Sequence, residues 1–120
     1  MIKFTAPLSP VTFKRPMQHQ RTRYNDPTYT EFKAAFGLFA RRAMNGRPPL
    51  IGYVTLTANF YRRKPKSFSA RNWGDLDNLL KAILDAMNGI CFIDDSQIVE
   101  LHARKCFGDP RIEVEMEAEA

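Results

Sequence analysis

Four aspartates and one lysine gather around one short apolar-periodic segment of this chain. Asp75 and Asp77 stand at its head, Lys81 follows one turn later, and the adjacent pair Asp94-Asp95 comes after a short apolar run. Carboxylate oxygens are the ligands that Mg²⁺ prefers, and a bound Mg²⁺ polarises a phosphodiester and lowers the pKa of a bound water. In a chain that is otherwise basic, the pattern indicates metal-dependent hydrolysis of nucleic acid.

The spacing of the first two aspartates sets a condition on the local structure. Residues two apart point in different directions on a regular helix. Asp75 and Asp77 therefore reach one ion only if Asp75 precedes the first turn, as an extended or N-cap residue, and Trp73-Gly74 before it is a suitable helix start. Helix capping, worth about 0.5–2 kcal/mol, is the competing explanation. From the spacing alone, a metal site and capping with surface charge are equally open.

Capping does not explain the second pair. Asp94 and Asp95 follow the apolar run 90–93 and precede a predicted strand. A strand that enters the sheet beside the helix would carry one of them back towards Asp77. Because adjacent residues of an extended chain point to opposite sides, we expect one aspartate of this pair to bind the metal directly. The other would cap a turn or hydrogen-bond the residues that bind the metal. Whether the site holds one ion or two stays open.

Two further polar residues lie on the same segment. Lys81 is four residues after Asp77, so both lie on one helical face. As a structural pair they are worth only about 0.2–0.5 kcal/mol. In a nuclease, the ammonium would stabilise charge developing on the phosphate or orient the attacking water. Asn78 would hydrogen-bond the carboxylates or the incoming loop, and Asp85 is left outside the site as part of the polar face.

The periodicities of the chain predict the elements that must position these residues. The expected strands span residues 2–6, 51–61, 97–105 and 111–118. A first helix is capped by Asp26 or Thr28, with Pro27 in its first turn, and ends at Asn45-Gly46. The second helix spans about 76–88, with Gly89 as its C′ residue. We therefore predict an α+β fold: a single compact domain over residues 1–120, with a mixed β-sheet of about four strands and two main helices.

Charge is segregated along the chain. Residues 1–74 carry net +12 and residues 75–120 carry net −7, which together give the formal +5. Four prolines over residues 7–27 predict an irregular basic segment, and a second basic run follows the strand 51–61. The residues expected to bind DNA are Lys14, Arg15, Arg21, Arg23, Arg62, Arg63, Lys64, Lys66 and Arg71. The competing reading, solvated faces of different sign, fits better for the glutamates of the last strand.

Cysteine content and hydropathy indicate the cellular compartment in which the protein works. Cys91 and Cys106 form neither a disulfide framework nor a metal-ligand spacing. No apolar run approaches the ~20 residues that a membrane span needs, and no secretory leader is recognisable at Met1. We expect a cytoplasmic protein that does not bind membranes, with Cys91 as a buried thiol.

Three segments together resemble the RusA family of Holliday-junction resolvases. They are Asp75-Leu76-Asp77-Asn78-Leu79-x-Lys81, then Asp85-Ala86-Met87-Asn88-Gly89, then Asp94-Asp95-Ser96-Gln97-Ile98-Val99. The similarity is close over roughly residues 73–105. In the N-terminal third only the basic, proline-containing character matches, so no residue roles carry over there.

The resemblance implies a small homodimeric endonuclease that requires Mg²⁺. Such an enzyme cuts two opposing strands of a four-way DNA junction by paired symmetric nicks, in recombination and repair, and similar proteins are often encoded by phages or prophages. By the family's pattern, Asp75, Asp77 and Asp95 are the catalytic, metal-binding aspartates and Lys81 is the catalytic lysine, with Asp94 a less direct candidate. A C2 dimer would also match the near-twofold symmetry of the junction.

Two other classes of function compete with this one. The first is a non-catalytic junction- or RNA-binding module whose acidic site is degenerate. The second is an interaction protein that uses the glutamate-rich last strand as its contact edge.

Overall fold

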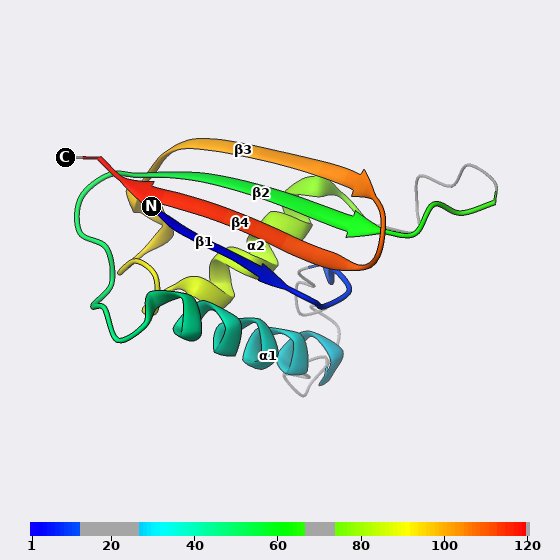
Figure 1. The fold of residues 1–120 in the computed structure, drawn as a ribbon, viewed down its shortest axis with the longest axis horizontal. Helices are drawn as coiled ribbons and strands as arrows, with labels where there is room; N and C mark the ends of the chain where they lie inside the picture. Colours follow the sequence, from blue (N-terminus) through cyan, green and yellow to red (C-terminus); the bar gives the residue numbers. More distant parts are fainter. Residues whose placement is uncertain (13–26, 67–73, 120) are drawn as a thin grey trace, which may run out of the picture.

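Four strands form one sheet, and two helices cover one of its faces. The computed structural model describes residues 1–12, 27–66 and 74–119. In chain order the elements are β1 (Ile2–Ala6), α1 (Pro27–Met44), β2 (Val54–Arg62), α2 (Leu76–Met87), the short 3₁₀ helix η2 (Asp95–Gln97), β3 (Ile98–Phe107) and β4 (Arg111–Ala118). The strand order is β1-β4-β2-β3, with β2 and β3 parallel and the other neighbours antiparallel. The predicted α+β fold is confirmed (Figure 1).

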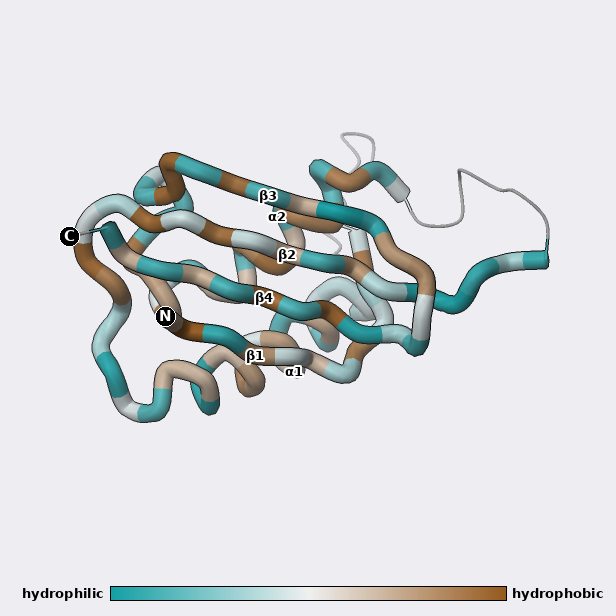
Figure 2. The backbone as a smooth tube through the Cα atoms, turned by 45° about the horizontal axis from the view of Figure 1, so that its top comes forward, coloured by the Kyte–Doolittle hydropathy of each residue, from teal (hydrophilic) through white to brown (hydrophobic). Residues whose placement is uncertain are grey.

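The core lies between the sheet and the helices. Alternate residues of β2, from Val54 to Phe60, are buried, as are Ile112, Val114 and Met116 of β4. Figure 2 shows the resulting alternation of hydrophobic and hydrophilic residues along β4. The helices contribute their apolar stripes, which include Phe32, Phe36 and Ala40 of α1 and Leu79, Ile83 and Met87 of α2. The glutamates of β4 point outward, as expected.

The connection from β2 through α2 to β3 decides where the polar residues lie. Because β2 and β3 are parallel, α2 must return the chain from the end of β2 to the start of β3. Its first turn therefore lies at the end of the sheet where β2 and β3 finish, and its last turn lies near the start of β3. Figure 1 shows α2 following this course across the face of the sheet that the helices cover.

Several predicted boundaries were wrong. The strand predicted from residue 51 begins at Val54, because Gly52 adopts φ +87° and Leu50 bridges to Phe92 instead. Thr28 does not cap α1, since the helix already includes Pro27; Asp26 lies outside the described residues.

The strand predicted over 97–105 is displaced at both ends. Residues 95–97 form η2, so β3 begins at Ile98, and it runs on to Phe107, in register with Arg62 of β2. No helix among the described residues is long and apolar enough to cross a membrane.

Burial gives the thiols of Cys91 and Cys106 different reactivities. Cys91 is fully buried, and burial raises the pKa of its thiol to about 12, whereas Cys106 is only half-buried. Because the thiolate is the nucleophile, we expect an aromatic disulfide reagent at pH 8 to titrate one thiol per native chain and two in denaturant. The Cys106→Ser variant should show none until it unfolds. Rapid reaction of Cys91 in that native variant would contradict the burial.

Candidate active site at one end of the sheet

Asp75 occupies the position that the spacing argument requires. It is the N-cap residue of α2, with φ −79° and ψ 146°, which is extended backbone. Its carbonyl oxygen accepts the first hydrogen bonds of the helix, from Asn78 N and Leu79 N at 3.1 Å each. Its side chain makes no capping hydrogen bond. Capping therefore does not explain Asp75, and its carboxylate is exposed at the head of the helix.

Asp77 lies in the first turn of α2 and is exposed. Its Oδ1 accepts a hydrogen bond from the backbone N–H of Asn78 at 3.0 Å. The positive end of the helix dipole favours a carboxylate here, and it also favours an anion such as phosphate. Asp75 and Asp77 thus place two carboxylates at one helix end. The half-buried Asn78 contacts both residues through its backbone N–H, which donates to Asp77 Oδ1 and to the carbonyl oxygen of Asp75.

Lys105 and Gly74 hold this helix end in place, and the hydrogen bond between them was not anticipated from the sequence. Lys105, near the end of β3, donates from Nζ to the carbonyl oxygen of Gly74 at 2.6 Å. Gly74 has φ +76°, and a Cβ atom there would collide with Thr12 Cγ2. A residue with a side chain would therefore disturb the turn that delivers Asp75. The Trp73-Gly74 pair predicted a helix start, but it gave no signal for the contact between Gly74 and Thr12.

Asp94 has a structural role. It caps η2, and its Oδ2 accepts from the backbone N–H of Ser96 at 3.0 Å. Gln97 Oε1 completes the capping box by accepting from the Asp94 N–H at 3.0 Å. The hydrogen bond from Ser96 holds the pKa of the Asp94 carboxyl below its usual range. This matches the expectation that one aspartate of the pair caps a turn.

Asp95 does not return towards Asp77 within the chain. It is the half-buried first residue of η2 and lines a shallow hollow with Leu84, Ile98 and Leu101 at the start of β3. Asp75, in contrast, lies beside Lys105. The seven steps along the strand from Ile98 to Lys105 span about 23 Å at the usual rise of a strand. The described part of one chain thus brings Asp75 and Asp77 together and leaves Asp95 at the opposite end of β3.

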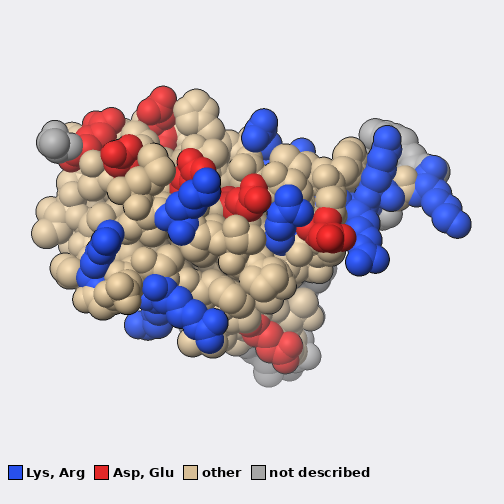
Figure 3. All heavy atoms as spheres, in the orientation of Figure 1, with Lys and Arg blue, Asp and Glu red and all other residues tan. Residues whose placement is uncertain are grey.

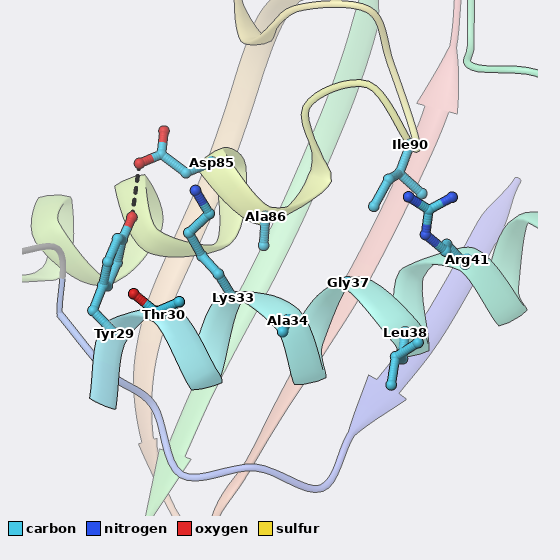
Figure 4. A pocket seen from close by; sticks show the side chains of 10 residues that line it. All are labelled: Tyr29, Thr30, Lys33, Ala34, Gly37, Leu38, Arg41, Asp85, Ala86 and Ile90. Atoms are coloured by element: carbon cyan, nitrogen blue, oxygen red, sulfur yellow. Dashed lines mark hydrogen bonds between the residues drawn. The ribbon is translucent and has the colours of Figure 1, made fainter. Parts of the chain in front are cut away.

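Lys81 shares the outward face of α2 with Asp77 and is exposed. One turn later, Asp85 Oδ2 accepts a hydrogen bond from Tyr29 OH of α1 at 2.7 Å (Figure 4). Burial, followed by this hydrogen bond, raises the pKa of Tyr29. Asp85 was assigned only to the polar face, but it also joins the two helices.

Four of the expected DNA-binding cations are at the same end as Asp75. Arg62 ends β2, and Arg63, Lys64 and Lys66 follow it in the arm that extends beyond the sheet, where Figure 3 shows a group of basic side chains. Arg63 Nε lies 3.8 Å from Asp109 Oδ1, with both side chains largely exposed. Lys14, Arg15, Arg21, Arg23 and Arg71 lie outside the described residues.

The donor set at this end fits Mg²⁺ in part. Among residues 1–12, 27–66 and 74–119, no group of three or more His, Cys, Asp or Glu side chains lies close enough to hold a metal ion. Mg²⁺ is commonly held by one or two carboxylates together with waters and substrate phosphate oxygens. The pair Asp75 and Asp77 meets that minimum, and a third ligand of the His, Cys, Asp or Glu type is not among the described residues of one chain.

Comparison with known proteins gives two matches. The family described as "Endodeoxyribonuclease RusA" matches residues 7–117. The chain is also 31% identical over 134 residues to "Uncharacterized protein YqaN" of Bacillus subtilis (strain 168), covering 94% of this chain and 93% of that protein. The family match includes both aspartate pairs and Lys81.

Gly74→Ala should damage the site, and Gly89→Ala provides a matched control. Both glycines have positive φ, +76° and +80°, but only at Gly74 would the new Cβ meet another residue. We expect Gly89→Ala to cost about 1 kcal/mol for the left-handed backbone and Gly74→Ala about 1–3 kcal/mol more for the collision, measured by urea unfolding.

The added Thr12→Ala change should recover most of that difference, because it removes the colliding methyl group. Equal unfolding free energies for Gly74→Ala and Gly89→Ala would show that Thr12 does not constrain the start of α2.

Proposed function

The chain belongs to the RusA endodeoxyribonuclease family, and we propose that it is a Mg²⁺-dependent, homodimeric endonuclease that resolves four-way DNA junctions by paired symmetric nicks. The observation that carries the proposal is the placement of Asp75 at the head of α2, next to Asp77. Its carboxylate makes no capping hydrogen bond and is therefore available to a metal ion. Junction-DNA binding fits the family. Because its substrate is DNA undergoing recombination and repair, we place the protein in the cytoplasm.

The proposed chemistry follows from the groups at this end of the sheet. Asp75 and Asp77 would hold Mg²⁺, which when bound supplies polarisation of the scissile phosphate and a water of lowered pKa. Lys81, on the same helical face as Asp77, stabilises negative charge on the phosphate. The arm of Arg62, Arg63, Lys64 and Lys66 attracts the DNA strand to the same end.

Asp95 enters this site from a second chain in our proposal. The reason is geometric, since Asp95 lies at the far end of β3 from Asp75. If β3 pairs antiparallel with β3 of a partner, the start of one strand lies against the end of the other. The partner's Asp95 then approaches the head of α2, and the dimer has two equivalent sites.

The exposed edge of β3 is suited to such pairing. It is an outer strand of the sheet, ten residues long and without proline, and Val99 and Leu101 are 53% and 41% exposed. Long apolar edge strands are templates for pairing with another chain. The half-buried Leu84 of α2 lines a hollow with Val99 and Leu101 at this edge and would extend an apolar interface.

Charge along β3 favours one register. Glu100, His102 and Arg104 align with Thr55, Thr57 and Asn59 of β2, so they lie on the outer face of the sheet. A twofold axis at His102 would place Glu100 of each chain opposite Arg104 of the other, which gives two such pairs per dimer. Opposite charges in such cross-strand pairs contribute about 0.2–1 kcal/mol each.

Substitution of the acidic pair should separate binding from chemistry. Asp75→Asn and Asp77→Asn should each abolish Mg²⁺-dependent nicking of a labelled four-way junction, while binding is retained or tightened, because repulsion of the phosphates is relieved. Glu117→Gln, which neutralises an exposed carboxylate at the opposite end of the sheet, is the control and should leave cleavage intact. Cleavage by Asp77→Asn at the wild-type rate would refute the assignment.

Mixing of inactive variants tests whether Asp95 acts across the dimer. Asp77→Asn and Asp95→Asn should each be inactive alone. After joint refolding, roughly half of the dimers contain one chain of each kind. In these heterodimers one site regains both aspartates, so we expect single nicks without paired cleavage. A mixture of Asp75→Asn and Asp77→Asn should stay inactive, because these residues come from the same chain.

An inactive mixture of Asp77→Asn and Asp95→Asn, with heterodimers demonstrated by mass spectrometry after one variant is labelled with ¹⁵N, would place the three aspartates in one chain. A non-catalytic junction-binding module is the alternative function, favoured because the described residues of one chain bring only two carboxylates to the site. It predicts that the wild type binds the junction equally with Mg²⁺ and with EDTA and leaves it uncut.

A further inference from the structure

The surface of α1 carries cations that the proposed active site does not use. Lys33, Arg41, Arg42 and Arg47 are exposed on or just after this helix. None of the four forms an ion pair with a carboxylate of the described residues; Lys33 and Arg42 instead lie over the rings of Tyr29 and Phe39, at 5.9 and 5.6 Å. Figure 3 shows basic side chains gathered at this edge of the molecule.

The cations on the outer face of the sheet differ in this respect. Lys3 pairs with Glu115 at 3.2 Å, and Arg111 pairs with Glu113 at 3.4 Å. Figure 3 shows acidic and basic side chains interspersed over the strands. Because these charges compensate locally, the sheet face offers a phosphate backbone little attraction, whereas the four cations of the α1 surface have no carboxylate partner among the described residues.

A groove between α1 and α2 lies within this basic surface. It has a volume of about 460 Å³, and its floor includes Ala34, Gly37, Ala86 and Ile90. In Figure 4, Lys33 extends over one end towards Asp85, and Arg41 lies at the other end beside Ile90. Asp85 is the one carboxylate among the described residues that line the groove, and Tyr29 already donates a hydrogen bond to it.

We propose that this groove binds the sugar–phosphate backbone of a DNA arm, with Lys33 and Arg41 contacting phosphates. Eight residues of helix place the two Cα atoms about 12 Å apart, which covers roughly three to four nucleotides at 3.4 Å per step. Asp85 belongs to the same helical face as Asp77 and Lys81, so the groove continues the path of DNA that leaves the head of α2. The inference rests on the proposed function, to which it adds the course of the substrate.

The test uses the cleavage-deficient Asp77→Asn protein and a fluorescent four-way junction, with binding measured by anisotropy from 50 to 300 mM salt. Lys33→Ala and Arg41→Ala, each added to that background, should weaken binding about five- to tenfold at 100 mM salt. Each should also lower the slope of log K against log salt by about 0.9, the value for one lost phosphate contact. Lys3→Ala, which removes a paired cation from the sheet face, is the control and should change neither quantity.

Unchanged slopes for both groove variants, with unchanged melting temperatures, would overturn the inference and leave the groove to a ligand other than DNA. That result is distinguishable from failure of the proposed function, in which the wild-type protein would leave the junction uncut in the presence of Mg²⁺. A loss in Lys3→Ala equal to that in Lys33→Ala would also overturn it, because the effect would then reflect net charge alone.

Discussion

Burial of the apolar face of α2 against the sheet is the constraint on which the site depends. Leu79, Ile83 and Met87 are completely buried, so the helix cannot rotate or shift without exposing them. That burial fixes Asp77 and Lys81 on the outward face and brings the start of the helix to the ends of β2 and β3. The hydrogen bond from Lys105 to the carbonyl oxygen of Gly74 then fixes the residue just before Asp75. The catalytic candidates are therefore positioned by a packed layer, and only the residues immediately before Asp75 depend on a turn.

Much of this arrangement could be predicted because its causes are local in sequence. The alternation along β2 and β4 and the apolar periodicity of α2 each specify an element and its buried face. The N-cap position of Asp75 was also inferable, since two aspartates two residues apart can share an ion only if one precedes the helix. The predicted starts of β2 and β3 were too early. The apolar pattern continues through Gly52 and through the segment capped by Asp94, but the local turn geometry at both places delays the strand.

What could not be predicted depends on the direction of β3. The proposition that a strand would return Asp95 towards Asp77 assumed that the strand starts near the head of α2. In the parallel arrangement, β3 starts near the other end of the helix, and about 23 Å of strand separates its first residue, Ile98, from Lys105. Strand direction is set by pairing between residues distant in sequence, such as Leu56 with Leu101. Similarly, the contact of Thr12 with Gly74 and the bond of Tyr29 with Asp85 join segments whose proximity no local pattern reveals.

The proposed dimer and the proposed DNA path constrain each other. Pairing Glu100 with the partner's Arg104 joins residues that lie on the same face of their own sheets, and this requires a twofold axis perpendicular to the sheet. Such an axis leaves the helical layers of both chains, and hence both α1 surfaces, on one side of the assembly. A junction approaching from that side would meet two equivalent acidic sites and two basic grooves without contacting the charge-compensated outer face. An axis within the plane of the sheet would instead turn the two helical layers to opposite sides, where one junction could not reach both. The charge order along β3 therefore favours the one geometry in which two symmetric nicks in a single junction are possible.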